Sequence, residues 1–303
     1  MNLSGMSVKK NNRVVAIPAV SIFVYFEKLA SEIAKPVADA IDKYVNFVEF
    51  DNIKHYSNNT GYWRNLTQTR YGRDLAILKD YPQDLLGHVM EYNSRNDGVP
   101  GTYGLYAFIS DKRRETAPLR ANYLRFDFDS LIIDSNDGTK FVDFYIDLLQ
   151  ALPFQSSHAG YSFKRIKATE KKATPGVNKK INRYFGFDPC YEPVKNKMIG
   201  YVFTPHWLNA INSSLEKKIG GFEKINKKLS TTKSIQIGNG LIMQGAQLPP
   251  VGDINRGASD IGSIPEIARL LKPLRTTINA LGEPYDAQSW LARYDDLDNR
   301  PWK

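Results

Sequence analysis

The spacing of apolar residues divides the first half of the chain into strands and helices. The run "VSIFVYFEK" at 20–28 predicts a buried strand, because it is apolar and rich in β-branched and aromatic residues. The residues after it carry apolar positions at helical spacing, with Pro36 marking a first turn or a kink. In chain order, the pattern predicts strand, helix, strand, strand, helix and strand at residues 20–28, 28–48, 102–110, 122–133, 135–152 and 158–166. This is the order of a split βαβ unit, as in ferredoxin-like folds.

The predicted fold class is therefore α+β, with a mixed or antiparallel sheet and helices packed on one face of it. In the strand at 122–133, apolar and polar residues alternate, so we expect one buried face and one face in water. The two sets are Leu124, Phe126 and Phe128 against Arg125, Asp127 and Asp129. The segment 51–100 has no clear period, and within it 81–92 predicts a short helix or strand.

The second half predicts a looser mixture of elements. "SIQIGNGLIMQG" at 234–245 predicts a hairpin, because alternating apolar residues flank a Gly-Asn-Gly turn. The segment 197–211 predicts a strand that leads into a short helix. Further helices are predicted at 220–229, 263–278 and 286–297.

A polar stretch between the two halves predicts a linker. Residues 169–180 are rich in lysine and interrupted by Pro175-Gly176. The predicted division is an α+β half at 1–168, this linker-like basic segment, and a second α+β half at 181–303. One continuous domain over 14–298 is the alternative.

Charge is unevenly distributed along the chain. The net charge is +9, and residues 151–233 carry 16 basic and 5 acidic side chains, while the segments on either side are close to neutral. Such a band attracts an anionic partner, whether an acidic protein face or a nucleic acid. Its basic runs contain few aromatic residues on which bases could stack, so we do not expect nucleic acid as the partner.

Residue types that carry metal or nucleophile chemistry are scattered. The four histidines, His55, His88, His158 and His206, stand apart, and Cys190 is the only cysteine, so we expect neither a metal site nor a cofactor. The stretch "SSHAGYS" at 156–162 lacks the G-x-S-x-G nucleophile elbow. A single cysteine fits a reducing compartment, which favours the cytoplasm.

Two features could suggest another location. The apolar stretch Val14 to Phe26 follows a basic start and has the length of a secretory signal, but its β-branched and aromatic residues, and the Glu27-Lys28 that follow, favour a buried strand. No apolar run reaches the eighteen residues of a membrane span, so we expect no membrane insertion.

The loop "GDINRG" at 252–257 could be structural or catalytic. Aspartate and asparagine accept backbone hydrogen bonds in turns, and glycines permit unusual φ angles, so we interpret it as a turn in which Arg256 clamps a nearby carboxylate. Its residues are Gly252, Asp253, Asn255, Arg256 and Gly257. The alternative is an enzyme acting on a small molecule or nucleotide, with Asp127, Asp129 and the 251–257 loop converging in a deep pocket.

The second half also resembles a known family. The pieces "GYVFTPHWLNAI", "KIGGFEKINKKL", "IQIGNGLIMQGAQLPPVGDINRG" and "WLARYDDL" are similar, in this order, to the type VI secretion immunity family, and "AGYSF" at 159–163 extends the resemblance into the first half. The resemblance implies a protein without catalytic residues or cofactor that neutralises a toxic effector inside the producing cell. Some members are paired with toxins that look like restriction-endonuclease-type nucleases.

On that resemblance, we expect the chain to bind a cognate effector toxin, one-to-one or as a homodimer, and to occlude its active site. Nanomolar affinity, roughly −12 kcal/mol, rests on a few aromatic and arginine anchors. Candidates in the irregular segment are Tyr56, Tyr62, Trp63 and Arg64, although these aromatics could equally be core residues. Candidates for electrostatic steering toward an acidic toxin face are Lys164, Arg165, Lys167, Lys171 and Lys172.

Overall fold

The computed structural model describes residues 3–57, 62–85, 87–95, 98–111, 120–133, 138–166, 169–188, 198–256, 260–276 and 291–295. In this part of the chain the strands are β1 (Val8–Lys10), β2 (Arg13–Phe26), β3 (His55–Ser57), β4 (Trp63–Asn65), β5 (His88–Asn93), β6 (Gly104–Ile109), β7 (Asn122–Phe128), β8 (Ser156–Lys164), β9 (Leu208–Asn212), β10 (Lys233–Ile237) and β11 (Gly240–Gln244). The α-helices are α1 (Ala30–Val48), α2 (Gln68–Lys79), α4 (Thr139–Ala151), α5 (Glu170–Ile181), α6 (Ser213–Lys218), α7 (Gly221–Lys228) and α8 (Ile264–Leu271). None of the helices described is long and apolar enough to cross a bilayer.

All described strands join one antiparallel sheet. Its order is β10-β11-β9-β8-β2-β7-β6-β5-β3-β4, and β1 pairs with β2 beside this path. The inner four strands, β8-β2-β7-β6, have the order of a ferredoxin-like unit, with α1 connecting out of β2 and α4 connecting β7 to β8. The predicted split βαβ order and the α+β class are therefore confirmed. The β3–β4–β5 strands extend this unit at one edge, and β9, β11 and β10 extend it at the other.

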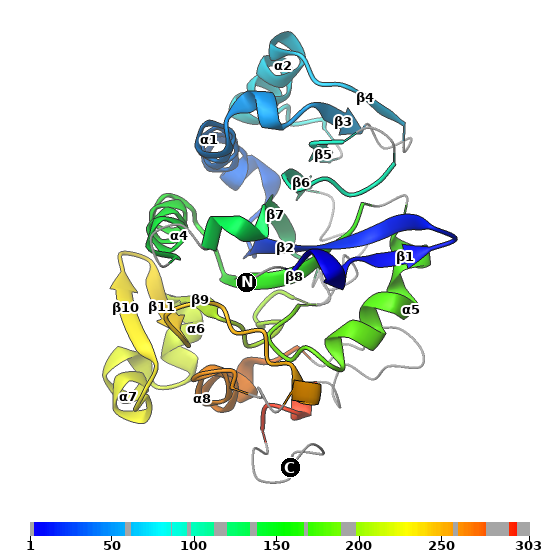
Figure 1. Cartoon of the computed structure of the whole chain (residues 1–303). Coiled ribbons are helices and arrows are strands. Elements are labelled where there is room, and N and C mark those ends of the chain that lie inside the picture. Colours follow the sequence, from blue (N-terminus) through cyan, green and yellow to red (C-terminus); the bar gives the residue numbers. More distant parts are fainter. Residues whose placement is uncertain are drawn as a thin grey trace.

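Helices α1 and α4 cover one face of the sheet. Tyr44 of α1 packs against Phe126 of β7, with ring centroids 4.8 Å apart, and α4 places Phe141 against Phe128 at 5.2 Å. In Figure 1, α1 and α4 lie to the left of the central strands, while α5 lies to the right beside β1. The apolar residues at helical spacing in these segments thus form the helix faces that cover the main core.

The second face of β7 is buried as well, which corrects the expected wet face. Arg125 is 5% exposed and Asp127 is 0% exposed. Arg125 lies opposite Phe23 of β2 and Tyr106 of β6 in the sheet, and both neighbours are themselves buried. The strand alternates in polarity because its second face buries a set of paired charges, not because that face meets water.

The predicted linker is a helix. Ala173, Val177 and Ile181 of α5 recur every four residues and are buried, so the helix packs its apolar stripe although Pro175 lies inside it. Gly176 allows α5 to approach β1, because a Cβ at this position would collide with Val8. The sheet continues across the predicted boundary through the pairing of β8 with β9, and the division into two halves stays a prediction.

The second half builds the other edge of the sheet. The hairpin at 234–245 is confirmed as β10 and β11, joined at Gly238-Asn239. The expected helix after a strand in 197–211 is wrong, because Leu208–Asn212 is itself a strand, β9, between β8 and β11. The helices predicted at 220–229 and 263–278 are found as α7 and α8, and α8 gives way to a 3-10 turn at Lys272–Leu274 that contains Pro273.

Candidate functional site

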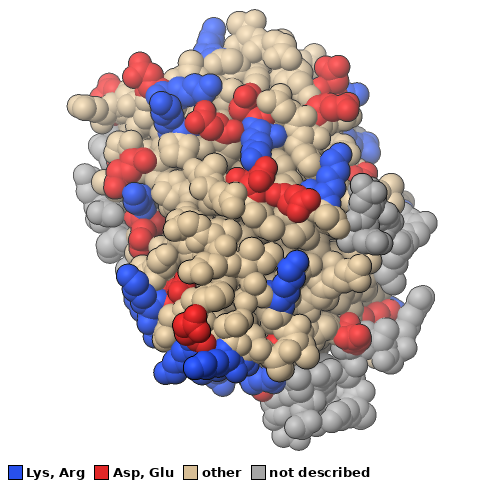
Figure 2. Space-filling view, turned by 90° about the vertical axis from the view of Figure 1, so that its left-hand side faces the viewer, with Lys and Arg blue, Asp and Glu red and all other residues tan. Residues whose placement is uncertain are grey.

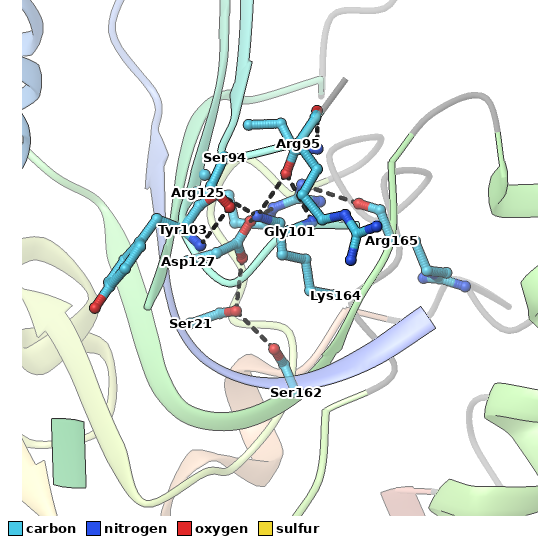
Figure 3. A network of polar contacts seen from close by, with 12 residues as sticks. Ser21, Ser94, Arg95, Gly101, Tyr103, Arg125, Asp127, Ser162, Lys164 and Arg165 are labelled. Carbon is cyan, nitrogen blue, oxygen red and sulfur yellow. Dashed lines mark hydrogen bonds and ion pairs between the residues drawn. The ribbon is translucent and has the colours of Figure 1, made fainter. Parts of the chain in front are cut away.

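A buried network of charges occupies the second face of the sheet. The Asp127 carboxylate accepts a hydrogen bond from Ser21 Oγ at 2.7 Å and from Arg125 Nε at 3.1 Å, and Lys164 Nζ lies 3.8 Å away. Ser21 Oγ in turn contacts Ser162 Oγ at 2.6 Å. Figure 3 shows these groups turned toward one another from β2, β7 and β8. The carboxylate is thus surrounded by three polar partners and is 0% exposed, as a buried structural charge is.

Lys164 ties the end of β8 to the start of β6. Its ammonium donates to the Tyr103 carbonyl at 2.7 Å and to Asn93 Oδ1 at 3.2 Å. Lys164 is 1% exposed, and the adjacent Arg165 is 2% exposed. The expectation that these two residues belong to an exposed basic band is therefore wrong: Lys164 is a buried strut whose charge is matched internally.

A second buried group brings together His158, Asp188 and His206. His158 Nε2 lies 3.3 Å from Asp188 Oδ2. His206 Nδ1 accepts the backbone N–H of Trp207 at 2.8 Å, so its Nε2–H donates to the Tyr161 carbonyl at 3.0 Å and the ring is neutral. Burial lowers the pKa of His206 to about 4, although the Asp188 carboxylate opposes the shift.

The serines beside His158 are occupied by the main chain. Ser157 Oγ donates to the Phe23 carbonyl at 2.7 Å, and Ser156 Oγ contacts the Tyr201 carbonyl at 3.3 Å. A nucleophile needs its hydroxyl hydrogen-bonded to a base, and neither hydroxyl bonds to His158. The arrangement gives no Ser–His pair at these two serines.

The loop at 252–256 is fastened to the chain that follows α5. Arg183 donates from Nε and a terminal nitrogen to the two oxygens of Asp253, each at 2.8 Å, so Arg183 clamps the aspartate of this loop. Tyr184 and Asp253 form a bridge, and the Asn255 N–H donates to Asp253 Oδ1 at 3.1 Å as a turn aspartate does. Gly252 has φ +61°, which favours glycine there. Gly257 lies outside the described residues, as does the side chain of Arg256.

The structure does not bring together the residues of the enzyme alternative. Asp127 is buried in the sheet, while Asp129 caps its own turn by accepting the Leu131 N–H at 3.0 Å. Within the described ranges no contact joins either aspartate to residues 251–256, and no group of three metal-binding side chains is found.

Two surface grooves formed by described residues are lined by neither Asp127 nor Asp129. One, of about 520 Å³, lies between α5, β1 and residues 182–184 and 254–255. The other, of about 640 Å³, lies between α6, α7 and α8. We call the second one the three-helix groove.

The predicted aromatic anchors lie at one edge of the sheet. Tyr62 is 74% exposed and precedes β4, the edge strand, in which Trp63 is half-buried and Arg64 exposed. Tyr56 in the adjacent β3 is half-buried, packs against the main core and lies under the Arg70 guanidinium at 4.6 Å. Of the predicted steering cations, Lys171 and Lys172 are exposed on α5, and Lys167 lies outside the described residues.

Five cations gather at the three-helix groove, and no sequence motif predicts that they converge. They come from three separate elements: Lys217 and Lys218 from α6, Lys224 and Lys228 from α7, and Arg269 from α8. The lysine-rich run that holds the first four is visible in the sequence. Its meeting with Arg269, some forty residues later, depends on how the three helices fold together.

Comparison with known proteins gives a family and a fold. A family model described as TsiV, type VI immunity for VRR-NUC, matches residues 37–294. Among solved structures, the chain is similar to a type VI secretion system protein of Pseudomonas aeruginosa, with a TM-score of 0.78 and 15% sequence identity over 97% of this chain and 88% of that one. Among curated proteins, no sequence matches significantly.

Proposed function

Because the chain belongs to the TsiV family of type VI immunity proteins for VRR-NUC effectors, we propose that it neutralises its effector by binding it and covering the nuclease site. The family match spans most of the chain, from α1 to the last described residues. It is the observation that carries the proposal, and it agrees with the resemblance in "AGYSF" and "GDINRG".

Protection by contact, without a chemical reaction, is supported by where the reactive side chains lie. Asp127, His158 and His206 are all buried and bonded to their own fold. A catalytic set would instead converge on a pocket that substrate can enter. The two grooves on the surface are lined mainly by basic, small and aliphatic side chains.

The free edge at β4 is our proposed anchor surface. An edge strand offers unpaired backbone groups, and Tyr62, Trp63 and Arg64 are of the residue types that contribute most to protein interfaces. Tyr56 contributes beneath them by holding the hairpin on the core. The exposed lysines of α5, Lys171 and Lys172, would raise the association rate with an acidic effector face.

The sign of the net charge separates two ways of inhibiting a nuclease. An inhibitor that imitated DNA would need a dense negative charge, because nucleic-acid sites attract phosphates with cations. This chain carries +9, so it would contact acidic protein surface and not stand in for the nucleic acid. We place the action in the cytoplasm of the producing cell, with a one-to-one complex or a homodimer as the binding unit and without nucleic acid.

A pull-down tests the proposal. The chain, immobilised, is incubated with the purified VRR-NUC effector encoded beside it, over a rising series of salt concentrations. We expect retention of the effector, with weaker retention as salt rises because the steering charges are screened. Absence of retention at low salt contradicts the proposal, and retention that ignores salt removes the steering role of the lysines.

A further inference from the structure

The three-helix groove gathers exposed cations that have no acidic partner. Its rim carries five basic side chains: Lys217, Lys218, Lys224, Lys228 and Arg269. All five are exposed, and in the described part of the chain no ion pair joins any of them to a carboxylate. In Figure 2, lysine and arginine side chains gather at the lower edge of the molecule, whereas acidic and basic groups alternate over the upper half.

Among the described residues that line the groove, the one carboxylate, that of Glu266, is already hydrogen-bonded. Glu266 of α8 accepts hydrogen bonds from Ser230 N and Oγ at 2.6 and 2.7 Å, and from Thr232 N and Oγ1 at 2.8 and 2.5 Å. Burial alone would raise the pKa of Glu266, but these hydrogen bonds outweigh it and lower the pKa to about 2. Glu266 therefore fastens residues 230–232 to α8 and leaves the cations of the rim without a counter-charge at bonding distance.

Local helix chemistry explains the presence of these cations but not their convergence. Lys217 and Lys218 lie in the last turn of α6, Lys228 in the last turn of α7 and Arg269 in the last turn of α8, where cations offset the helix dipole. A cation in the last turn of a helix would offset the dipole equally well if its side chain pointed in any other exposed direction. Because the five basic side chains face one shared groove, they repel one another, and an anionic partner would relieve this repulsion.

The backbone between α6 and α7 holds this geometry. Gly220 has φ +113°, which only glycine adopts readily, and it turns the chain from α6 into α7 within two residues. The aliphatic part of the Lys224 side chain lies directly over Gly220, so a Cβ at position 220 would collide with it. Lys224 therefore packs against the α6–α7 turn.

The floor of the groove is apolar. Ile219 and Leu270, each 8% exposed, and the exposed Pro273 line it below the rim. A partner segment that fits both parts carries carboxylates around at least one apolar side chain. A nucleic acid fits less well, because no aromatic side chain lines the groove for base stacking and Glu266 would repel a phosphate backbone.

We propose that the three-helix groove is a docking site for an acidic segment of the effector, with aspartate or glutamate side chains on the rim and an apolar side chain on the floor. This rests on the proposed function, and it places a second contact surface at the opposite end of the sheet from β4. The two surfaces together would let one chain grip the effector at separate points.

Charge reversal tests the groove against a matched control. Lys224→Glu with Lys228→Glu changes the rim, and Lys10→Glu with Lys35→Glu makes the same change in net charge at exposed positions on β1 and α1. Circular dichroism establishes that each variant is folded. Association with the VRR-NUC effector domain is then measured by surface plasmon resonance at low and at physiological salt. We expect the rim variant to lose about tenfold or more in association rate at low salt beyond the loss of the control.

The outcomes separate the two proposals. If the wild-type chain does not bind the effector, the proposed function fails. If it binds and the rim and control variants behave alike, the groove proposal alone fails.

A second arm needs no effector. A labelled glutamate-rich peptide containing leucine, and a DNA duplex of similar charge, are each titrated into the free chain and the rim variant. Peptide binding that the rim variant loses supports the groove proposal. Rim-dependent binding of the duplex without the peptide overturns it in favour of a nucleic-acid site.

Discussion

Single buried charges contribute to this fold through the partners that surround them. Asp127 has Ser21, Arg125 and Lys164 around its two oxygens, and all four residues are buried. Removing one member of such a set leaves the others desolvated and unpaired, which costs far more than the set contributes in net stability. The stability of the central strands therefore depends on each member being present.

Asp127→Ala should lower the free energy of unfolding by about 3 kcal/mol or more, because Arg125 and Lys164 would stay buried without their carboxylate. Urea unfolding followed by circular dichroism measures the change. The control is Asp129→Ala, two residues along on the same strand end, where the side chain is half-buried and bonds only a turn N–H in the described network. We expect a loss of about 1 kcal/mol there. Equal losses for the two variants would contradict the account of the network.

Tyr62→Ala should weaken effector binding by about 2 kcal/mol, or some thirtyfold in Kd, if the β4 edge is the anchor surface. The free energy of unfolding of this variant should hardly change, because the Tyr62 side chain is 74% exposed in the wild-type chain. Calorimetric titration gives the affinity. Tyr201→Ala is the matched aromatic control on a different segment, 38% exposed, and a larger loss there than at Tyr62 would move the interface away from β4.

Single residues also show which features can be predicted from the sequence alone and which cannot. The sequence leaves open whether the aromatics of the aperiodic segment are anchors or core residues, and in the structure Tyr62 and Arg64 are exposed while Trp63 is half-buried. Lys164 and Arg165 are buried, although the local lysine-rich pattern is typical of a solvated face. Only the pairing of β2, β7 and β8 brings Asp127 and Lys164 together, and that pairing joins residues far apart in the chain.

At the scale of elements, tertiary packing overrides local breaking signals. Pro175-Gly176 indicated a linker, yet Ala173, Val177 and Ile181 form a buried helical stripe, and Gly176 is needed where α5 meets β1. The apolar stripe is present in the sequence, but the Pro-Gly pair is the stronger local signal and favours a break. The Arg183–Asp253 clamp is different in kind, because no local pattern distinguishes Arg183 from the nearer Arg256.

The ribbon formed by residues 183–186 and 251–254 should be sensitive to one glycine. A Cβ at Gly186 would collide with the Pro250 carbonyl oxygen, so Gly186→Ala must push the two segments apart. We expect a loss of about 2 kcal/mol or more in unfolding free energy, from the displaced hydrogen bonds of Phe185 and Gly186 to residues 251–252. Gly238→Ala, in the β10–β11 turn with no atom near the added methyl, is the control. Thermal unfolding of both variants compares their stabilities. An unchanged stability of Gly186→Ala would contradict the packing described.

His206 should make stability fall as the solution is acidified. The pKa of His206 in the folded chain, about 4, lies below the ordinary value of 6.5. Between these two pH values the unfolded chain therefore binds a proton at His206 and the folded chain does not. The stabilising contribution is therefore complete above about pH 6.5 and is lost as pH falls toward 4, by up to about 1.4 kcal/mol per pH unit. Urea midpoints at pH 7, 6 and 5 give the slope. His206→Gln should flatten it, and an unchanged slope in that variant would assign the acid sensitivity to other groups.

At the scale of the whole molecule, a ferredoxin-like unit is extended at both sheet edges, and each extension carries one proposed contact surface. The core order could be predicted because strong periodic segments fix it. The edge additions β3, β4 and α2 were missed, because short strands and a weakly amphipathic helix leave little periodic signal. The immunity role follows from the family match and not from any chemical motif in the sequence.

The most direct test of protection by contact is a stoichiometric titration of effector nuclease activity. The effector is held at a concentration well above the expected nanomolar Kd and incubated with increasing amounts of the chain, and cleavage of a DNA substrate is followed. We predict a linear fall to zero at a fixed whole-number ratio, unchanged by longer incubation, with the effector recovered at its original mass and active after dissociation. Inactivation by far less than one equivalent, growing with time or leaving a modified effector, would contradict the account.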